Sequence, residues 1–497
     1  MTIITLRGYS TSDSGKYVGK RTDGNDRASQ PLAIIKAVAH LFLGLILAIN
    51  AFGQSQTQSA VLEKDVRAEL GFLASDALQG RGSGTEFERV AAEYIGSQFM
   101  QFGLEPEGDE GWDGKLSYIQ EGSFPRKVFS ENPRLTFNST SLEHGTSMLV
   151  LRASGEKIEG PLQRRRSGDT TMVGSVVFLT FSQNEVRQTP QALNAVVQPL
   201  FTAGAAIVMV AETPAYRSQW TAIGARMPAL INNPTAKTGT LVLLDDKSAA
   251  AISALADGTS IDFEGSTTTL TQNTWNTIAK LAGSDEKQGG DVLLLSAHLD
   301  HVGVNLKAPG PDKIYNGADD DASGVVAVLE LARILSKSHP KRTIYFVCFG
   351  SEEVGGLGAT YFMDHLPFSK AKLAANLEFE MIGRPDEKLK PDELWLTGFD
   401  RTNLGPELAS RGAKLVPDPR PEENFFIRSD NYKLAQQGIV AQTISSFGLH
   451  KDYHQPTDEL KTIDFAHLTK SINSLLLPVD WLANSSFVPV WIDGKKP

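Results

Sequence analysis

Two short apolar runs, each followed within a few residues by acidic or histidine side chains, constrain the fold of this chain most. Residues 292–297 (VLLLSA) lead directly to His298, and residues 343–349 (TIYFVCF) lead to the acidic pair Glu352 and Glu353. A continuous apolar run of this length is typical of a strand that helices cover on both faces. Sites in such sheets form at the carboxyl ends of the strands. The sequence therefore predicts a mostly parallel, mixed α/β sheet sandwiched by helices, with a site at its strand ends.

Three further segments carry side chains of the same kind. Residues 315–324 (YNGADDDASG) form a polar turn before a helix predicted over 325–335. An acidic loop at a helix N-terminus suits both the helix dipole and a cation. Glu380 lies near the end of a strand-like segment, and His454 lies in a loop that follows another one. These positions predict that all the segments meet at one site.

The chemistry of these side chains favours a metal site. Zinc accepts imidazole nitrogen and carboxylate oxygen, and a catalytic zinc keeps one position open for water. Two zinc ions can share two histidines, two terminal carboxylates and one bridging carboxylate. The chain offers five such residues: His298, Asp320, Glu353, Glu380 and His454.

In this order, the segments resemble the motifs of the co-catalytic di-zinc peptidase family of metallopeptidase clan MH. That family holds secreted bacterial aminopeptidases, glutamate carboxypeptidases and glutaminyl cyclases. Residues 73–85 also resemble its amino-terminal segment, and residues 426–430 resemble its substrate-side loop, so the resemblance covers roughly residues 60–485. The motifs that carry the resemblance are His298-x-Asp300, 317–324, 351–355, 380–383 and 453–458.

The resemblance implies two zinc ions and a role for each ligand. Asp320 would bridge the two ions. His298 and Glu380 would complete one zinc, and Glu353 and His454 would complete the other. The family often has Asp where this chain has Glu380, and the longer side chain changes how the carboxylate reaches its zinc.

The resemblance also implies roles beside the metals. A water held between two cations is acidified, and Glu352 would take its proton as the general base and pass one to the leaving amine. Asp300 would accept a hydrogen bond from the far nitrogen of His298 and fix its tautomer. Arg428 and Asp430 would either line the substrate pocket or pair with each other.

Other residues are interpreted as structural. Glu378 is a possible substitute for Glu380, because alternation along a strand puts both on one face. The single cysteine, Cys348, lies within an apolar run and is predicted to be buried, and one cysteine excludes a disulfide framework. Five more histidines fit no ligand position of the family and are predicted to be structural or exposed: His301, His339, His365, His450 and His467.

The first part of the chain is predicted to be a targeting leader, residues 1–54. Residues 37–53 form a mostly apolar stretch, and Ala51 and Gly53 provide small residues for cleavage. The stretch is short for a membrane span, which favours a cleaved signal peptide and a secreted or periplasmic protein. An uncleaved leader that anchors the protein to a membrane is the alternative.

The rest of the chain is predicted to be a peptidase domain with an insertion. The insert is rich in strands and resembles a protease-associated domain; an extension without a binding role is the alternative. The predicted ranges are 60–139 for the first part of the peptidase domain, 140–272 for the insert, 273–487 for the metal-binding core and 488–497 for a tail.

Together these features predict a secreted zinc exopeptidase that acts on peptides, with an aminopeptidase favoured. A carboxypeptidase, a glutaminyl cyclase and an amidase or deacylase are alternatives on the same fold. A catalytically inactive binding protein is disfavoured because all five ligands and Glu352 are present. The net charge of −10 argues against nucleic-acid binding. No stable membrane partner is expected after signal cleavage, and no oligomeric state is predicted.

Overall fold

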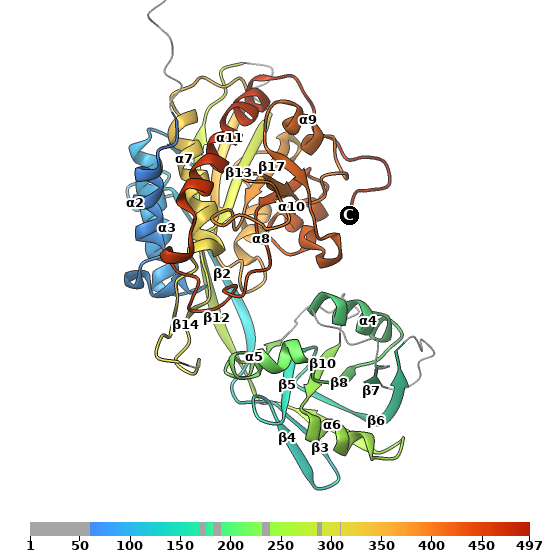
Figure 1. The fold of residues 1–497 in the computed structure, drawn as a ribbon. Helices are drawn as coiled ribbons and strands as arrows, with labels where there is room; N and C mark the ends of the chain where they lie inside the picture. Colours follow the sequence, from blue (N-terminus) through green and yellow to red (C-terminus); the bar gives the residue numbers. More distant parts are fainter. Residues whose placement is uncertain (1–59, 168–174, 182–189, 231–238, 286–290, 309) are drawn as a thin grey trace, which may run out of the picture. The chain divides into compact units, whose positions relative to one another are not determined.

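The computed structural model describes residues 60–497 except 168–174, 182–189, 231–238, 286–290 and 309 (Figure 1). The predicted leader, residues 1–54, lies outside the described residues. In the part of the chain that is described, no helix has both the length and the apolar character needed to cross a membrane.

A mixed sheet of nine strands forms the centre of the larger domain. Its four central neighbours, β16, β13, β17 and β20, run parallel, and antiparallel pairs flank them. The predicted mixed α/β sheet is therefore confirmed, with the parallel pairing concentrated at its centre. The strand order is β1 (Glu105–Pro106), β12 (Thr267–Leu281), β16 (Thr343–Phe349), β13 (Val292–His298), β17 (Leu373–Phe379), β20 (Ala441–Ser445), β18 (Leu394–Leu396) and β19 (Leu415–Pro417), and β2 (Ile119–Phe129) pairs with β12.

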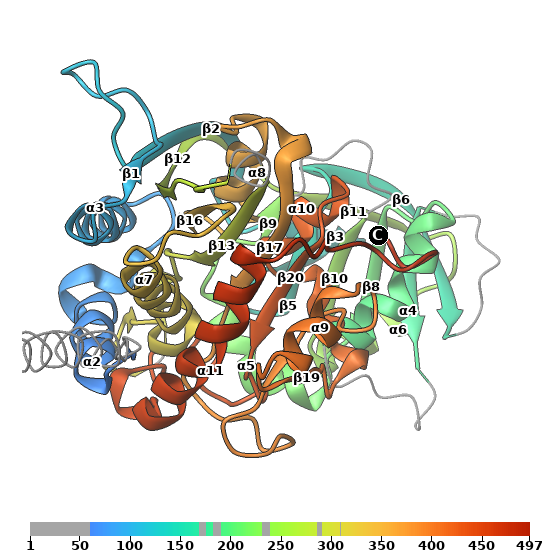
Figure 2. The same cartoon turned by 90° about the horizontal axis from the view of Figure 1, so that it is seen from above.

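Helices cover both faces of this sheet, as the apolar strands require (Figure 2). In β13, Leu293 and Leu295 pack into one apolar core, whereas Leu294 packs into the core on the opposite face. The alternation of side chains along a strand explains why both faces must be apolar. The first face is covered by α2 (Glu63–Leu73), α3 (Glu86–Gln101), α7 (Gly324–Leu335), α9 (Leu404–Ser410) and α11 (Phe465–Asn484), and the second by α8 (Leu357–Asp364) and α10 (Asn431–Gln436).

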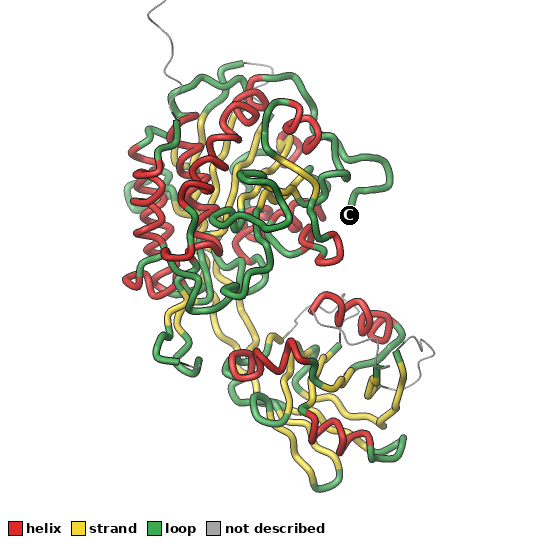
Figure 3. Tube along the Cα trace, viewed as in Figure 1, coloured by secondary structure: helices red, strands yellow, loops and turns green. Residues whose placement is uncertain are grey.

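A second sheet of nine strands is inserted between β2 and β12 (Figure 3). The whole of β2 pairs with residues 267–277 of β12. It begins at Arg134, before the predicted boundary at 140, because β3 pairs with both β4 and β11. The predicted end at 272 falls within β12, which belongs to the first sheet. The order is β4 (Thr140–Glu143), β3 (Arg134–Phe137), β11 (Ser260–Glu264), β6 (Lys157–Arg166), β7 (Val176–Thr180), β8 (Ile207–Ala211), β10 (Thr240–Leu244), β5 (Met148–Ala153) and β9 (Ala229–Leu230), with helices α4 (Pro190–Thr202), α5 (Pro214–Gly224) and α6 (Asp246–Ser253).

Candidate metal centre

The carboxyl ends of the parallel strands bring the metal-ligand candidates together. His298 is the last residue of β13, and Glu380 directly follows β17. Two groups of potential donor atoms form there, and they share Asp320. One group adds His298 and Glu380, and the other adds Glu353, His454 and His301. All five predicted ligands are therefore neighbours, and a sixth residue, His301, joins them.

Asp320 lies between the two groups with one oxygen towards each. Its Oδ1 lies 3.2 Å from Nε2 of His298. Its Oδ2 lies 3.2 Å from Nε2 of His454 and 3.7 Å from Nδ1 of His301. In the second group, Nε2 of His454 also lies 2.9 Å from Oε1 of Glu353. A carboxylate with its two oxygens facing two separate donor sets is arranged to bridge two cations.

Backbone amides hold the segment that carries Asp320. The Asp458 carboxylate accepts a hydrogen bond from the amide of Asp320 at 3.1 Å. The neighbouring Asp321 accepts from the amides of Gly324 and Met381, both at 3.0 Å, and so joins α7 to the end of β17. Burial raises the pKa of the Asp321 carboxyl well above its usual range. Among residues 319–321, only Asp320 belongs to the donor groups. Asp321 accepts from backbone amides, whereas Asp319 accepts from the Gly383 amide and contacts His450.

The Asp300 carboxylate organises the turn that presents the acidic pair. It accepts hydrogen bonds from the amides of Glu352 at 2.9 Å and Glu353 at 3.3 Å, and from the Ser83 hydroxyl at 2.5 Å. The preceding residue, Ser351, has a φ of 54°, so the chain turns sharply after β16. The hydrogen bonds to Asp300 thereby fix the backbone of Glu352 and Glu353, and with it the starting position of their side chains.

The contact between Asp300 and His298 differs from the expected one. Nδ1 of His298 lies 3.2 Å from the backbone oxygen of Asp300, whereas the carboxylate is 3.7 Å away, beyond a hydrogen bond. The ring is still held by Asp300, but through the carbonyl, because the carboxylate is occupied by the turn. Burial opposes the protonated form of His298, yet Asp300 and Asp320 outweigh it and raise its pKa well above the usual value.

Removal from solvent also shifts the pKa of the predicted base. It raises the pKa of the Glu352 carboxyl well above its usual range, with Asp430 adding to the effect and His298 opposing it. Glu352 belongs to neither donor group. It therefore lies next to the ligand Glu353 in sequence while remaining available for proton transfer.

Arg81 is a buried residue that links several segments around the site, a role that the sequence did not predict. Its side chain is 0% exposed, and its guanidinium donates hydrogen bonds to the backbone oxygens of Leu73, Leu299, Asn316 and Gly317. These carbonyls belong to three separate segments around the site. A planar group with five donors can hold such segments together.

Glu88 is a second buried support that the sequence reasoning did not identify. Its carboxylate accepts from the Trp275 amide and the Thr274 hydroxyl, both at 3.1 Å, and from the Gly84 amide. The Ser351 hydroxyl donates to it at 3.3 Å, which connects α3 to the turn before the acidic pair. Burial raises the pKa of Glu88 to about 8, despite the opposing effect of the backbone donors. Its only signal in the sequence was an acidic residue near the start of an amphipathic helix.

The residues fit a bound cation. Four polar side chains of the cluster have buried atoms without a hydrogen-bond partner in the described protein: Nε2 of His298, both ring nitrogens of His301, Oδ2 of Asp320 and Oε1 of Glu353. Such orphaned atoms are costly unless a ligand satisfies them. Burial disfavours a charged His454, but Glu353 and Asp320 prevail and raise its pKa to about 10. The surroundings thus favour positive charge at this place.

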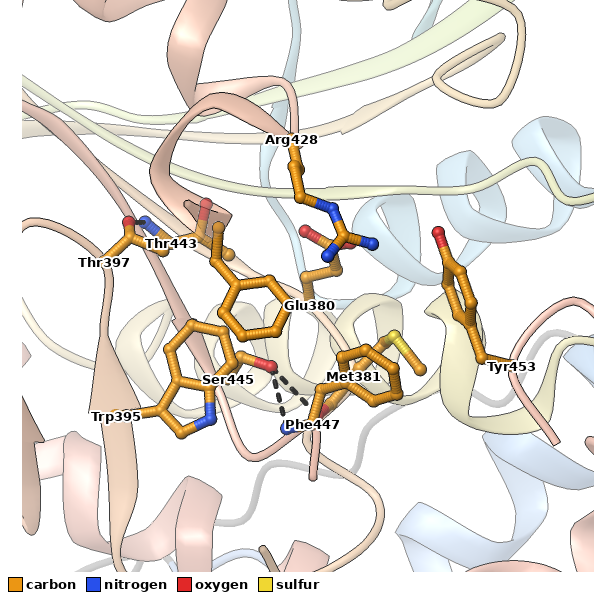
Figure 4. Close-up of a pocket in the computed structure, with 10 residues that line it drawn as sticks. Glu380, Met381, Trp395, Thr397, Arg428, Thr443, Ser445, Phe447 and Tyr453 are labelled. Atoms are coloured by element: carbon orange, nitrogen blue, oxygen red, sulfur yellow. Dashed lines mark hydrogen bonds between the residues drawn. The ribbon is translucent and has the colours of Figure 1, made fainter. Parts of the chain in front are cut away.

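A small cavity of about 20 Å³ adjoins Glu380 (Figure 4). Figure 4 shows the Arg428 side chain directed towards the Glu380 carboxylate, and its guanidinium carbon lies 4.9 Å from the ring centre of Phe425. This volume holds about one water. Besides Glu380 and Arg428, the walls combine aromatic and apolar side chains with hydroxyl groups: Met381, Trp395, Thr397, Phe425, Thr443, Ser445, Phe447 and Tyr453.

Two more buried carboxylates, Glu378 and Asp430, lie close enough to Glu380 to interact with it electrostatically. Glu378 accepts a hydrogen bond from the Asn431 amide and belongs to neither donor group, so the possible substitution for Glu380 does not occur. Asp430 is 1% exposed, and neither of its oxygens has a hydrogen-bond partner among the residues that the structure describes. Burial raises the pKa of Asp430 to about 7, with His298 opposing the effect.

Three of the histidines interpreted as structural have ordinary partners. Nε2 of His450 lies 3.0 Å from Asp319, Nε2 of His467 lies 3.2 Å from the Ser446 hydroxyl, and Nδ1 of His365 contacts a backbone oxygen. His301 differs from them because the structure places it in the donor cluster. That interpretation of His301 therefore needs correction. The interpretation of Cys348 as a buried residue is confirmed.

The fold and the donor set match those expected of a metallopeptidase. Residues 276–477, less than half of the chain, match the model of peptidase family M28. The resemblance inferred from the motifs is thereby confirmed.

Curated relatives match parts of the chain. Leupeptin-inactivating enzyme 1 of Streptomyces exfoliatus is 27% identical over 251 residues, which are 46% of this chain and 54% of that protein. An aminopeptidase of Pseudomonas aeruginosa is 35% identical over 114 residues, or 23% of this chain and 19% of that protein. Aminopeptidase YwaD of Bacillus subtilis is 26% identical over 188 residues, or 36% and 39%. The chain thus matches about half or less of the length of these relatives.

Solved structures share the fold over most of the chain. An aminopeptidase from Aneurinibacillus sp. strain AM-1 superimposes with a TM-score of 0.58 at 18% identity, covering 86% of this chain and 95% of that one. A zinc aminopeptidase from Bacillus subtilis gives a TM-score of 0.54 at 19% identity, covering 86% and 97%. At sequence identities of 18% and 19%, these similarities show a shared fold alone.

Proposed function

We propose that this protein is a zinc-dependent exopeptidase that removes residues from the amino terminus of peptides. The observation that carries the proposal is the placement of Asp320 between two sets of donor atoms, with Glu352 beside them. The match of residues 276–477 to peptidase family M28 and the relatives named as aminopeptidases and a zinc aminopeptidase support it.

Each group of the centre has a distinct task in this proposal. His298 and Glu380 would hold one zinc, Glu353 and His454 would hold the other, and Asp320 would contribute to both. Bound zinc supplies Lewis acidity, which polarises a carbonyl and makes water more acidic. The other steps belong to the protein.

Glu352 moves the proton. Its raised pKa suits a group that accepts a proton from water and later gives one to the leaving amine. Asp300 serves by fixing the amide of Glu352, and thereby where the carboxylate lies. We expect Asp300 to act as a positioning residue, because its carboxylate is fully occupied by the turn.

The charge around the cavity favours an amino terminus over a carboxyl terminus. Glu378 and Asp430 add buried carboxylates next to Glu380 that belong to neither donor group. Burial raises the pKa of Asp430 to about 7 and that of Glu378 well above its usual range. A substrate ammonium group would favour the ionised form of these carboxyls and be attracted by it, whereas a substrate carboxylate would oppose it. Arg428 is the one cationic side chain among the residues that line the small cavity, so it is the residue a carboxypeptidase would use.

The cavity beside Glu380 is proposed to receive the first side chain of the substrate. Its aromatic and apolar walls favour an apolar side chain. At about 20 Å³ the space is closed around one water's volume. A large side chain therefore requires Arg428 or Tyr453 to move.

The leader and the insert complete the proposal. Residues 1–54 are proposed to form a cleaved signal peptide that directs secretion or export to a periplasm. The strand-rich insert is proposed to be a protease-associated-like domain. Mass spectrometry of the mature protein tests the first point, since a mature terminus near residue 54 is expected and an intact Met1 terminus would contradict it.

The proposed activity is tested by zinc content and by hydrolysis of aminoacyl anilides with free and with acetylated amino groups. We expect two zinc ions per chain and cleavage of the free-amine substrates only. Glu352→Gln is expected to keep both metals and to lower kcat by about 10²–10⁴-fold. The matched variant at the adjacent position, Glu353→Gln, is expected to lose metal as well.

Other outcomes identify the alternatives. Cleavage of carboxyl-terminal residues would indicate a carboxypeptidase, and cyclisation of an amino-terminal glutamine with one zinc would indicate a cyclase. Cleavage of acetylated or nonpeptide amides would indicate a deacylase or amidase. A protein without zinc and without turnover would be a binding protein.

A further inference from the structure

His301 is buried within the second donor group although no family motif assigned it there. Its side chain is 0% exposed. Nδ1 lies 2.9 Å from Oε1 of Glu353 and 3.7 Å from Oδ2 of Asp320. Its ring packs edge to face against His454, with ring centres 5.6 Å apart. Two imidazoles and two carboxylates therefore surround one point.

These short separations are not ordinary hydrogen bonds. Neither ring nitrogen of His301 has a hydrogen-bond partner of acceptable geometry in the described protein, and neither does Oε1 of Glu353. A nitrogen and an oxygen at 2.9 Å without an aligned N–H are typical of two ligands directed at a shared ion. By contrast, the buried His467 meets the Ser446 hydroxyl at 3.2 Å.

The position of the His301 ring is fixed by its surroundings. Its amide donates to the Arg81 backbone oxygen at 3.1 Å, and its own carbonyl accepts from the Ser83 amide. Gly317 has a φ of +60°, and a Cβ added there would lie 2.6 Å from the His301 ring. The absence of a side chain at Gly317 thus makes the room that the ring occupies. Held in this way, the imidazole keeps its place without a partner of its own.

We propose that His301 is a further metal ligand, acting through Nδ1, in the half of the centre formed by Glu353 and His454. The inference rests on the proposed two-metal centre and extends it. It makes the two halves unequal, because one half has two imidazoles and the other has only His298.

The unequal halves have a chemical consequence. Imidazole suits zinc and other late transition ions, whereas carboxylate oxygen also suits harder ions. The half with His301 is therefore expected to hold zinc more tightly and to release it last when a chelator is added. The half with His298 and Glu380 is expected to exchange its ion first.

A His301→Cys variant loaded with Co²⁺ tests the position of the ligand directly. A thiolate bound to Co²⁺ gives a charge-transfer band in the near ultraviolet, and it forms only where the sulfur reaches the ion. We expect the band in this variant and no such band in the wild type, whose single cysteine is Cys348. The matched His467→Cys variant places a thiol at a buried histidine outside the donor groups and is expected to give no band. Absence of the band in the His301→Cys protein, loaded with two Co²⁺, would overturn the proposal.

A second variant measures the contribution to affinity. His301→Gln is expected to lose one metal at a chelator concentration about 100-fold lower than the wild type needs, a larger change than most supporting residues produce. Thermal unfolding of the apoprotein controls for misfolding. Equal metal retention by His301→Gln and the wild type would show that the imidazole only packs there.

The failures of the two proposals are distinguishable. If the wild type binds two metals and cleaves free-amine substrates but both His301 variants behave like it, only the role of His301 is wrong. If the wild type binds no metal, the proposed function itself is wrong.

Discussion

The catalytic sheet and the sheet of the insert are built alike but treat the polar groups at their strand ends differently. Both contain parallel strands with fully buried apolar residues, such as β13 in the first and β10 in the second. In the insert, Asp245 after β10 caps α6 by accepting from the Ser248 amide at 2.7 Å. Glu212 after β8 pairs with Arg217 at 2.9 Å. In the catalytic sheet, side chains such as His298 and Glu353 converge with Asp320, and each has an atom without a hydrogen-bond partner among the described residues.

This difference teaches what marks the site. A buried parallel sheet offers strand ends in either domain, so the architecture alone does not indicate chemistry. Several histidine and carboxylate atoms converging without hydrogen-bond partners do, because burying such a cluster is costly unless a ligand satisfies it. Single orphaned atoms also occur in the insert, such as Oγ1 of Thr213. Among the residues that the structure describes, the two donor groups both lie in the catalytic domain.

The largest expected effect comes from Asp320, the carboxylate shared by both groups. Asp320→Asn is expected to remove both metals and to lower kcat/KM by about 10³-fold or more, because several kcal/mol of charge stabilisation is lost. The matched change in the insert is Asp257→Asn, at an exposed carboxylate that pairs with Arg164. It is expected to leave zinc content and activity unchanged. Zinc analysis and anilide hydrolysis measure both, and retention of two zinc ions by Asp320→Asn would remove the bridging role.

A buried and an exposed arginine extend the comparison to stability. Arg81→Met leaves four buried carbonyls without their donor and is expected to lower the free energy of unfolding by about 3 kcal/mol or more. Arg217→Met removes exposed ion pairs of the insert and is expected to cost less than about 1 kcal/mol. Denaturant unfolding of both variants gives the values. Equal losses of unfolding free energy in the two variants would show that Arg81 does not hold the segments together.

Glu88 predicts a pH dependence that originates in the catalytic domain. Its pKa is raised to about 8 in the folded state, so the folded protein keeps a proton that the unfolded chain releases near pH 4.5. Stability therefore falls as pH rises between these values, by at most about 1.4 kcal/mol per pH unit from this group. Glu88→Gln is expected to remove that part of the slope when thermal unfolding is followed from pH 5 to 8. Parallel pH profiles for the variant and the wild type would contradict the raised pKa.

The smallest effect is expected at the cap in the insert. Asp245→Ala removes the acceptor for the Ser248 amide and is expected to cost about 1 kcal/mol of stability, without loss of zinc. Thermal unfolding and metal analysis of the same preparation check this. Loss of metal would mean that the insert supports the metal centre, against the contrast drawn between the two sheets.

Elements buried on both faces were predictable with close boundaries. The apolar run 343–349 coincides with β16, and the run 292–297 lacks only the last residue of β13. A short, wholly apolar segment of this kind is best placed as a central strand, because helices then cover its side chains on both faces of the sheet. The limits of the insert were harder to predict. β12 pairs with β16 near its carboxyl end, and its earlier residues form a ribbon with β2 that borders the insert in sequence.

Glu378 and Glu380 show where local pattern was insufficient. Alternation puts both on one face of a strand, but β17 ends at Phe379, so Glu380 leaves the strand towards the metal site. Glu378 stays in the strand and meets the amide of Asn431. The choice between them depends on where α10 packs, which is distant in sequence.

The sequence by itself determined the class of fold, the five candidate ligands and the acidic pair, because burial and metal chemistry leave a pattern in neighbouring residues. Only the tertiary structure decided that His301 joins the centre, that Asp300 holds the turn of Glu352, and that Arg81 and Glu88 support them. Those roles depend on contacts between segments far apart in the chain. In the sequence, none of these residues is distinguished from others of its type, because its role depends on which groups surround it in the folded protein.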